Sequence, residues 1–207
     1  MGRRRRSNDP VTRVTITRAS GRTTTKNISR GSGCLPIGTM VRTCSGLKDI
    51  ASIRPNDIIL SFDIESYSLV ERRVTKIFEY SSGEIIIFYF GEHKFHSTPS
   101  HTVLTLGGWK RAKHITVGDQ ILINQENMWI WHKIDGLEKI PATASVFNLT
   151  TVGEHNFIAD GVIVHNFSFM RKFRTFLHAF LFDRIYTLSH PEDGANSQRG
   201  GINLVTG

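Results

Sequence analysis

Short stretches of alternating apolar and polar residues, separated by turn signals, run through most of this 207-residue chain. Period-two alternation rich in Ile, Val, Thr and Phe is typical of half-buried β-strands. The predicted strands cover residues 39–43, 57–63, 69–80, 84–90, 102–106, 120–123, 128–134 and 144–150. Helical turns are predicted near 47–53 and 110–115. The pattern therefore predicts an all-β domain.

An internal repeat supports this β architecture. At a constant offset of 62, residues of the first half recur in the second half: Val41, Thr43, Gly46, Ile53, Asp57, Ile59 and Leu60 match Val103, Thr105, Gly108, Ile115, Asp119, Ile121 and Leu122. The common core reads Ile-x-x-x-Asp-x-Ile-Leu in both halves. A repeat of this length predicts two similar β subdomains related by a pseudo-two-fold axis.

The first 33 residues differ from the rest of the chain in charge. They hold nine Lys or Arg and one Asp, a net charge of +8, whereas residues 34–207 hold 17 basic and 17 acidic groups. We therefore interpret residues 1–33 as a basic, flexible flank with at most one short strand near 11–17. Its run of Arg3, Arg4, Arg5 and Arg6 suits polyanions or acidic surfaces, and a solvated tail is the other interpretation.

Residues 167–207 form the opposite flank. Apolar residues recur at helical spacing over 169–186, with basic residues between them, which predicts an amphipathic helix. Such a helix suits a membrane surface, a partner's groove or a face of its own domain. The last residues, 189–207, are polar and Gly-rich and predict a loose tail.

Cysteine usage and hydropathy narrow the class of protein. With only Cys34 and Cys44, the chain is not a disulfide scaffold, and a reducing compartment is favoured. No apolar run is long enough to span a membrane, and the early arginines are not followed by the apolar core of a signal peptide. We therefore favour a cytoplasmic location, and we interpret Cys44 as a small buried residue.

The first candidate chemistry lies at residues 165–166. The apolar run 161–164 predicts a buried strand that delivers His165 and Asn166 to a fixed place. An Asn side-chain amide can attack its own backbone carbonyl, close a succinimide and cut the chain after itself. Orientation in a rigid site is worth about 7–11 kcal/mol to such a reaction. Taken alone, a His-Asn pair is also compatible with an ordinary turn.

Two upstream motifs place this pair in a larger pattern. The chain contains Cys-Leu-x-x-Gly-Thr from Cys34, Thr-x-x-His from Thr98 to His101, and His-Asn-Phe-x-Ala-Asp-Gly-Val-x-Val-His-Asn from His155 to Asn166. In this order the motifs resemble inteins and Hint domains, above all the bacterial-intein-like subset, over about two-thirds of the chain. The resemblance implies a Hint fold, a flattened β horseshoe whose two chain ends meet in one central cleft.

The resemblance also implies roles at the upstream end. The thiolate of Cys34 would attack the carbonyl of Gly33 and turn the peptide bond into a thioester. A free thiol titrates near about 8.5, so the site must lower that pKa or supply a base. His101 would bond and protonate the backbone nitrogen of Cys34, and Thr98 would help to hold the carbonyl.

At the downstream end, Asn166 would cyclise and break its bond to Phe167. By resemblance, His155 assists this cyclisation and His165 polarises the carbonyl of Asn166. Some family members have an acidic or thiol residue where this chain has Asn148, and an amide cannot act as a base.

Phe167 departs from the pattern of splicing inteins, which have Cys, Ser or Thr at this position. It resembles bacterial-intein-like domains, which have a non-nucleophilic residue there. Ser168 is one residue too late to replace that nucleophile. Two outcomes remain: the freed amine of Phe167 attacks the thioester and joins Gly33 to Phe167, or water, a thiol or another amine resolves the thioester. We expect cleavage to dominate, with ligation as a minor product.

The predicted function is therefore a single-turnover, self-processing domain over residues 34–166. It acts in cis as a monomer on its own flanks and needs no cofactor or metal; we interpret His93 and His96 as surface residues. One alternative is a Hedgehog-like domain that passes its thioester to an external nucleophile. The other is an inactive Hint core in a nucleic-acid- or membrane-binding protein. The five motif side chains favour processing: Cys34, Thr98, His101, His165 and Asn166.

Overall fold

The computed structural model describes residues 12–28, 33–64, 66, 68–125, 128–153 and 155–166. The first strands are β1 (Thr12–Arg18), β2 (Thr23–Ile28), β3 (Leu35–Pro36), β4 (Met40–Thr43), β5 (Gly46–Asp49), β6 (Ile58–Asp63), β7 (Ser68–Phe90) and β8 (His93–Ser97). They are followed by β9 (Thr102–Thr105), β10 (Gly108–Arg111), β11 (Gln120–Gln125), β12 (Met128–Lys133), β13 (Gly136–Thr151), β14 (Asn156–Ala159) and β15 (Val162–His165). Two 3-10 turns complete this set, η1 (Ile50–Ser52) and η2 (Ala112–His114). The prediction of an all-β domain is confirmed.

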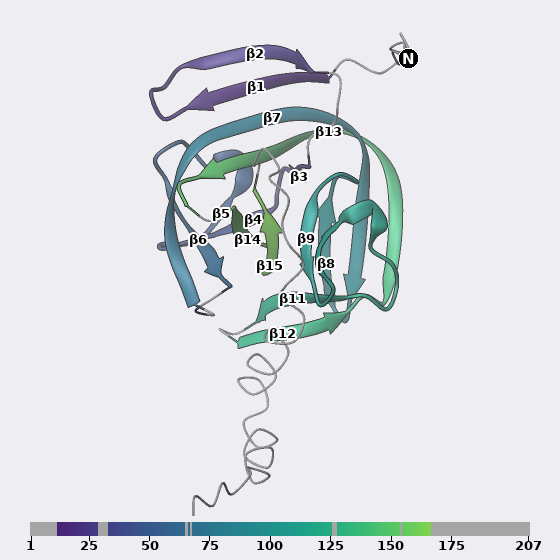
Figure 1. Ribbon diagram of the computed structural model, residues 1–207. Coiled ribbons are helices and arrows are strands. Elements are labelled where there is room, and N and C mark those ends of the chain that lie inside the picture. The colour runs from purple at the N-terminus through teal and green to yellow at the C-terminus, as the bar shows by residue number, and fades with distance from the viewer. Residues whose placement is uncertain are drawn as a thin grey trace, which may run out of the picture.

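All these strands belong to one sheet, in the order β10-β9-β11-β15-β14-β4-β6-β7-β1-β2, with the remaining strands attached to its sides. The long strands β7 and β13 pair antiparallel, and Figure 1 shows them arching over the shorter strands inside the horseshoe. The sequence predicted two strands, 69–80 and 84–90, where β7 is continuous. Pairing with β13 holds the polar stretch 81–83 extended, with a register shift between Pro141 and Ala144 in place of a turn.

Other differences from the prediction have the same cause, which is pairing across the sheet. The short strands β3, β8 and β14 were not predicted, and each is held by a partner: β13, β7 and β15 respectively. The two predicted helical turns each consist of a strand followed by a 3-10 turn, β5 with η1 and β10 with η2. The strands form because β5 closes a hairpin with β4, and β10 closes one with β9.

The internal repeat is visible in matching contacts. In the β4–β5 hairpin, the hydroxyl of Thr43 donates to the carbonyl of Gly46 at 2.8 Å. In the β9–β10 hairpin, Thr105 donates to Gly108 at 2.6 Å. The predicted pseudo-two-fold repeat is therefore confirmed at the level of individual hydrogen bonds.

An ion pair also recurs at the same offset, and its lysines are a match that the sequence comparison missed. Lys48 pairs with Asp57 at 2.7 Å, and Lys110 pairs with Asp119 at 2.6 Å. Each carboxylate also accepts a backbone N–H three residues upstream. Partial burial opposes ionisation of both carboxyls, but the lysine and backbone donors outweigh it and lower both pKa values.

Three apolar clusters fill the interior. The largest draws on both long strands and both repeats. A second cluster contains Cys34 packed with apolar side chains of β7 and β13: Phe78, Tyr80, Ile85 and Val146. A third lies around Phe62, Leu104, Leu122 and Ile163. Cys44, predicted to be buried, is exposed because it lies in the turn between β4 and β5.

The N-terminal segment contributes to the sheet. The prediction of at most one short strand within 1–33 is wrong, because β1 and β2 form a hairpin and β1 pairs with β7. The arginine run 3–6, Phe167 and the helix predicted over 169–186 lie outside the described residues. Within the ranges that the structure describes, no helix combines the length and apolar character needed to cross a membrane.

Candidate functional site

The peptide unit of Cys34 is clamped by Thr98, which follows strand β8. The backbone N–H of Cys34 donates to the Thr98 hydroxyl at 2.8 Å, and the Thr98 N–H donates to the Cys34 carbonyl at 2.9 Å. The hydroxyl in turn donates to the same carbonyl at 3.1 Å. The sequence predicted that His101 would bond the Cys34 nitrogen, whereas Thr98 occupies that place. The side chain of Thr98 faces Cys34 because the backbone N–H of Thr98 is bound to the carbonyl of Cys34.

The turn from Thr98 to His101 brings the histidine against Gly33. The His101 N–H donates to the Thr98 carbonyl at 3.0 Å, and the Ala112 N–H donates to the His101 carbonyl at 2.7 Å. A Cβ atom on Gly33 would lie 2.6 Å from the Cα of His101 and 2.8 Å from the Ser100 carbonyl oxygen. Only a glycine therefore fits before Cys34 without displacing this backbone.

His101 is a buried, neutral imidazole. Burial lowers its pKa to about 4, an effect that the nearby Gly33 carbonyl opposes and His165 reinforces. Neither ring nitrogen makes a hydrogen bond of good geometry to another described residue. At neutral pH the ring is therefore uncharged: one of its nitrogens carries a proton, and the other can accept one.

Asn148 contacts the carbonyl that Cys34 would attack. It lies on β13, and its side-chain Nδ2 donates to the Gly33 carbonyl oxygen. Its own Oδ1 accepts the Leu149 N–H at 2.7 Å, which leaves the NH₂ group as the one that faces Gly33. From the sequence, Asn148 was not expected to act as a base, because an amide cannot do so. An amide is, however, a hydrogen-bond donor, and Asn148 contacts the Gly33 carbonyl in that capacity.

At the other end of the domain, His165 contacts the carbonyl of Asn166, which belongs to the peptide bond predicted to break. The Nδ1 of His165 lies 2.6 Å from the Asn166 carbonyl oxygen. Because a carbonyl oxygen only accepts, Nδ1 must carry the proton. Burial lowers the pKa of His165, and the neighbouring His155 lowers it further. The hydrogen bond to the Asn166 carbonyl has the opposite effect, which is smaller than that of burial. The ring is thus a neutral donor to the Asn166 carbonyl.

The amide nitrogen of Asn166 is also held. Its Nδ2 donates to the hydroxyl of Thr151 at 2.6 Å, in a buried position. The Asn166 backbone N–H donates to the His155 carbonyl at 2.8 Å, which continues the pairing of β14 with β15. Thr151, at the end of β13, was not predicted, and nothing in its local sequence marks it.

His155, a predicted site residue, contacts the site with its ring as well as with its backbone carbonyl. Its ring stacks on that of His165 with 6.2 Å between centroids, and Trp109 meets the His165 ring edge-on at 5.1 Å. The His155 side chain is exposed, so the stack lies at the border between the site and solvent.

The two ends meet through His101 and His165. Strand β15 pairs with β9 at Val164 and Val103, next to these two histidines. His165 is close enough to lower the pKa of His101, which in turn abuts Gly33. The structure therefore brings together the predicted residues of both ends, Cys34, Thr98, His101, His165 and Asn166, and adds Asn148 and Thr151. His93, predicted to be a surface residue, is exposed at the start of β8, with its ring beside those of Phe90 and His132, whereas His96 is half-buried.

A single-sheet β horseshoe with cysteine at one end and His-Asn at the other defines the Hint fold of inteins, a class of self-processing domains. The family model described as the pretoxin Hint domain matches residues 40–167. The chain belongs to this family. The matched segment begins after Cys34, so it leaves out both this cysteine and the N-terminal hairpin.

Solved structures share the fold. The DnaB intein from Synechocystis sp. PCC 6803 aligns with a TM-score of 0.59 at 22% identity, covering 66% of this chain and 100% of the intein. The bacterial intein-like domain from Clostridium thermocellum aligns with a TM-score of 0.60 at 21% identity, also covering 66% and 100%. The Hint prediction is therefore confirmed.

Two curated relatives are RecA proteins. The protein from Mycobacterium leprae is 28% identical over 107 residues, which is 46% of this chain and 15% of that protein. The one from Mycolicibacterium thermoresistibile is 28% identical over 101 residues, which is 44% of this chain and 24% of that protein. The chain thus matches only a minor part of each relative.

Proposed function

We propose that this Hint domain breaks its own Gly33–Cys34 and Asn166–Phe167 bonds. The observation that carries the proposal is that each of the two carbonyl groups to be attacked accepts a hydrogen bond from a fixed side chain. Asn148 donates to the Gly33 carbonyl, and His165 donates to the Asn166 carbonyl. Donors aimed at a carbonyl stabilise the negative charge that develops on its oxygen during attack.

The upstream step is an N-to-S acyl shift. His101, neutral because it is buried, takes the proton of the Cys34 thiol, and the thiolate attacks the Gly33 carbonyl carbon. A C–S bond forms, and Asn148 stabilises the oxyanion. The C–N bond of Gly33–Cys34 then breaks, and His101 returns the proton to the departing nitrogen, which Thr98 holds in place.

The downstream step is cyclisation of Asn166. Its Nδ2, oriented by Thr151, attacks the Asn166 carbonyl carbon, while His165 stabilises the oxyanion. A C–N bond closes the succinimide, and the bond to Phe167 breaks. One proton leaves Nδ2 and one reaches the departing amine of Phe167. We infer that the His155–His165 stack carries this proton, because it borders solvent.

The main outcome is cleavage. Phe167 has no side-chain nucleophile, so the thioester is resolved by water, a thiol or an external amine, and joining of Gly33 to Phe167 through its freed amine is the minor path. The description of the family as a pretoxin domain supports release of a flank as the product.

Intact-mass measurement of freshly expressed full chain tests the proposal. We expect a fragment ending at Gly33 that is absent from Cys34→Ala, and one beginning at Phe167 that is absent from Asn166→Ala. Cys44→Ser, at the exposed second cysteine, is the matched control and should process like the wild type.

Two other outcomes change the conclusion. A product that joins 1–33 to 167–207 would make ligation a main path. A wild-type mass that stays at full length, even after long incubation with thiol, would contradict self-processing. It would favour a binding module built on an inactive Hint core, with the arginine run 3–6 as the site for polyanions.

A further inference from the structure

The β1–β2 hairpin fills an edge of the central strand β7. On one edge, β7 pairs with β13 along most of its length. On the opposite edge, β8 pairs with residues 86–90, and β1 pairs with residues 76–80. Without β1, the backbone of 76–80 would present an unpaired sheet edge, which attracts any strand able to add to it. The sheet edge 76–80 is therefore a surface that needs a partner strand.

One face of β1 reaches the cluster around the nucleophile. Ile16 packs against the apolar cluster that contains Cys34, Phe78 and Val146. In the sheet, Ile16 is directly opposite Phe78, which is itself opposite Asn148 on the far edge. The hairpin thus contacts the cluster around Cys34 through Ile16.

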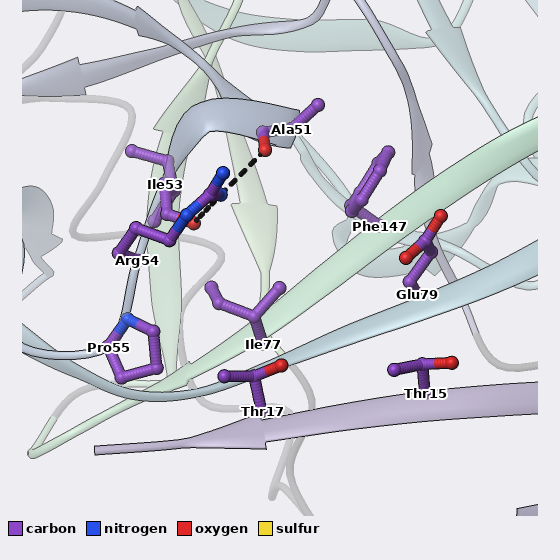
Figure 2. A pocket seen from close by; sticks show the side chains of 9 residues that line it. All are labelled: Thr15, Thr17, Ala51, Ile53, Arg54, Pro55, Ile77, Glu79 and Phe147. Carbon is purple, nitrogen blue, oxygen red and sulfur yellow. Dashed lines mark hydrogen bonds between the residues drawn. The ribbon is translucent and has the colours of Figure 1, made fainter. Parts of the chain in front are cut away.

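The other face of β1 is packed less closely. Thr15 and Thr17 line one side of a pocket of about 350 Å³, with Ile53, Ile77 and Phe147 among the residues around it (Figure 2). The pocket lies between β1, β7, β13 and the segment 51–55, so this face of β1 is not part of the close-packed core.

The hairpin is also a self-contained unit with its own turn. The Gly21 N–H donates to the Arg18 carbonyl at 2.8 Å, and the Arg18 N–H donates to the Arg22 carbonyl at 3.1 Å. A backbone bond from Ala19 to Thr75, at 3.1 Å, fixes the turn to β7. The hairpin precedes both the scissile bond and the segment matched by the family model, so it belongs to the flank that the reaction detaches.

We propose that the β7 edge 76–80 is a docking site for the chain's own N-terminal flank, which binds by strand addition through β1. The consequence is that the fragment 1–33 stays bound after the Gly33–Cys34 bond breaks, so that cleavage alone does not release it. This inference rests on the proposed function for the event that breaks the bond.

The test uses the full chain carrying Asn166→Ala, which keeps the downstream bond intact. Hydroxylamine cleaves the thioester, and native gel filtration separates bound from free fragment. We expect the fragment 1–33 to elute with the domain. Ile16→Asp should weaken its binding by about tenfold or more, whereas Thr25→Asp, at an exposed position on β2, should leave it bound.

Thr17→Pro provides a second variant, because it interrupts the β1 ladder without touching the Cys34 cluster. Unchanged hydroxylamine cleavage in either variant shows that the domain is still folded. Release of the wild-type fragment as fast as that of both variants would overturn the docking site.

A third arm separates this inference from the proposed function. In a chain with Cys34→Ala and Asn166→Ala, a protease recognition sequence replaces residues 29–32, and the added protease makes the cut. Retention here without hydroxylamine cleavage in the first arm would overturn the self-processing function but support docking. Free fragment in both arms would overturn docking whatever the outcome of the chemistry.

Discussion

At the scale of single residues, Gly33 has little freedom to vary. Its Cα faces the backbone of Ser100 and His101, so a methyl group would come within 2.6 Å of a backbone carbon. Gly33→Ala should therefore slow hydroxylamine-dependent cleavage at Gly33–Cys34 by about tenfold or more. Cleavage after Asn166 in the same chain should be nearly unchanged, and it serves as the internal control. Equal loss at both bonds would indicate general misfolding.

Asn148 is expected to matter as a donor and not as a base. Asn148→Ala removes the donor to the Gly33 carbonyl and should slow thioester formation by about 10²-fold. Asn148→Asp should be no better, because a carboxylate places negative charge where the oxyanion develops. Time courses of hydroxylamine cleavage in the Asn166→Ala background measure both. A fully active Asn148→Asp would instead assign a base to this position.

Thr151 is expected to act only at the downstream bond. Its hydroxyl orients the attacking nitrogen of Asn166, so Thr151→Ala should slow release of the C-terminal fragment by about tenfold, while Thr151→Ser should retain most of the rate. The Cys34→Ala background isolates this step. A Thr151→Ser variant as slow as Thr151→Ala would show that the methyl group matters through packing.

At the scale of elements, strands β14 and β6 are joined by a side-chain amide that makes the hydrogen bonds a paired backbone would make. Asn156 on β14 accepts the Phe62 N–H of β6 at 2.8 Å and donates to the Phe62 carbonyl at 2.9 Å. Both groups are buried, so no water replaces a lost partner. The amide thus closes the gap between β14 and β6.

We expect Asn156→Ala to lower the free energy of unfolding by roughly 2 kcal/mol or more, because it removes two buried hydrogen bonds to the backbone of Phe62. Asn156→Asp keeps the acceptor but loses the donor, and it should be destabilised as well. Urea denaturation of chains carrying Cys34→Ala and Asn166→Ala, to prevent processing, measures the difference. A change under about 0.5 kcal/mol for Asn156→Ala would contradict this role.

Some of the strands could be predicted from the sequence, and others could not. The alternation of β4 was readable because the strand has one face in the core. Strands β6, β9 and β11 were readable as short apolar runs, and their side chains contribute to two of the core clusters. The continuity of β7 was not, since Ser81, Ser82 and Gly83 are residue types typical of turns, and the stretch is extended because Ser81 and Ser82 pair with β13. Likewise, the β1–β2 hairpin has polar residues on most positions, and its place is determined by the open edge of β7.

At the scale of the whole molecule, the buried histidines couple stability to pH. The pKa of His101 is about 4 in the folded state, below its value of 6.5 in an exposed chain. Between these values the unfolded chain binds the proton and the folded chain does not. Stability is therefore complete above about pH 6.5 and decreases as the pH falls towards 4, by roughly 3 kcal/mol for this residue. The lowered pKa of His165 acts in the same direction.

Urea unfolding of the processing-deficient chain at about pH 7 and about pH 4.5 measures this effect. We expect His101→Asn to reduce the loss of stability on acidification, because Asn does not titrate. If the two chains lose the same stability, His101 is not the group that takes up the proton on unfolding.

The sequence by itself determined the β class, the internal repeat and the motif residues Cys34, Thr98, His101, His165 and Asn166. These features could be predicted because period-two alternation, a constant repeat offset and an ordered set of rare residue types can all be read from the linear sequence. Thr98 was predicted to help to hold the carbonyl that Cys34 attacks, whereas its hydroxyl bonds the nitrogen of Cys34, the contact predicted for His101, and the carbonyl of Cys34.

Only the tertiary structure decided which group each of these residues contacts. Asn148 reaches a carbonyl 115 residues away, and Thr151 reaches an amide 15 residues away, and neither partnership leaves a mark in the local sequence. Likewise, the low pKa of His101 follows from its burial, and burial depends on how the sheet closes around the residue. Contacts and desolvation are properties of neighbours in space, and those neighbours exist only once the two long strands have curved the sheet around the site.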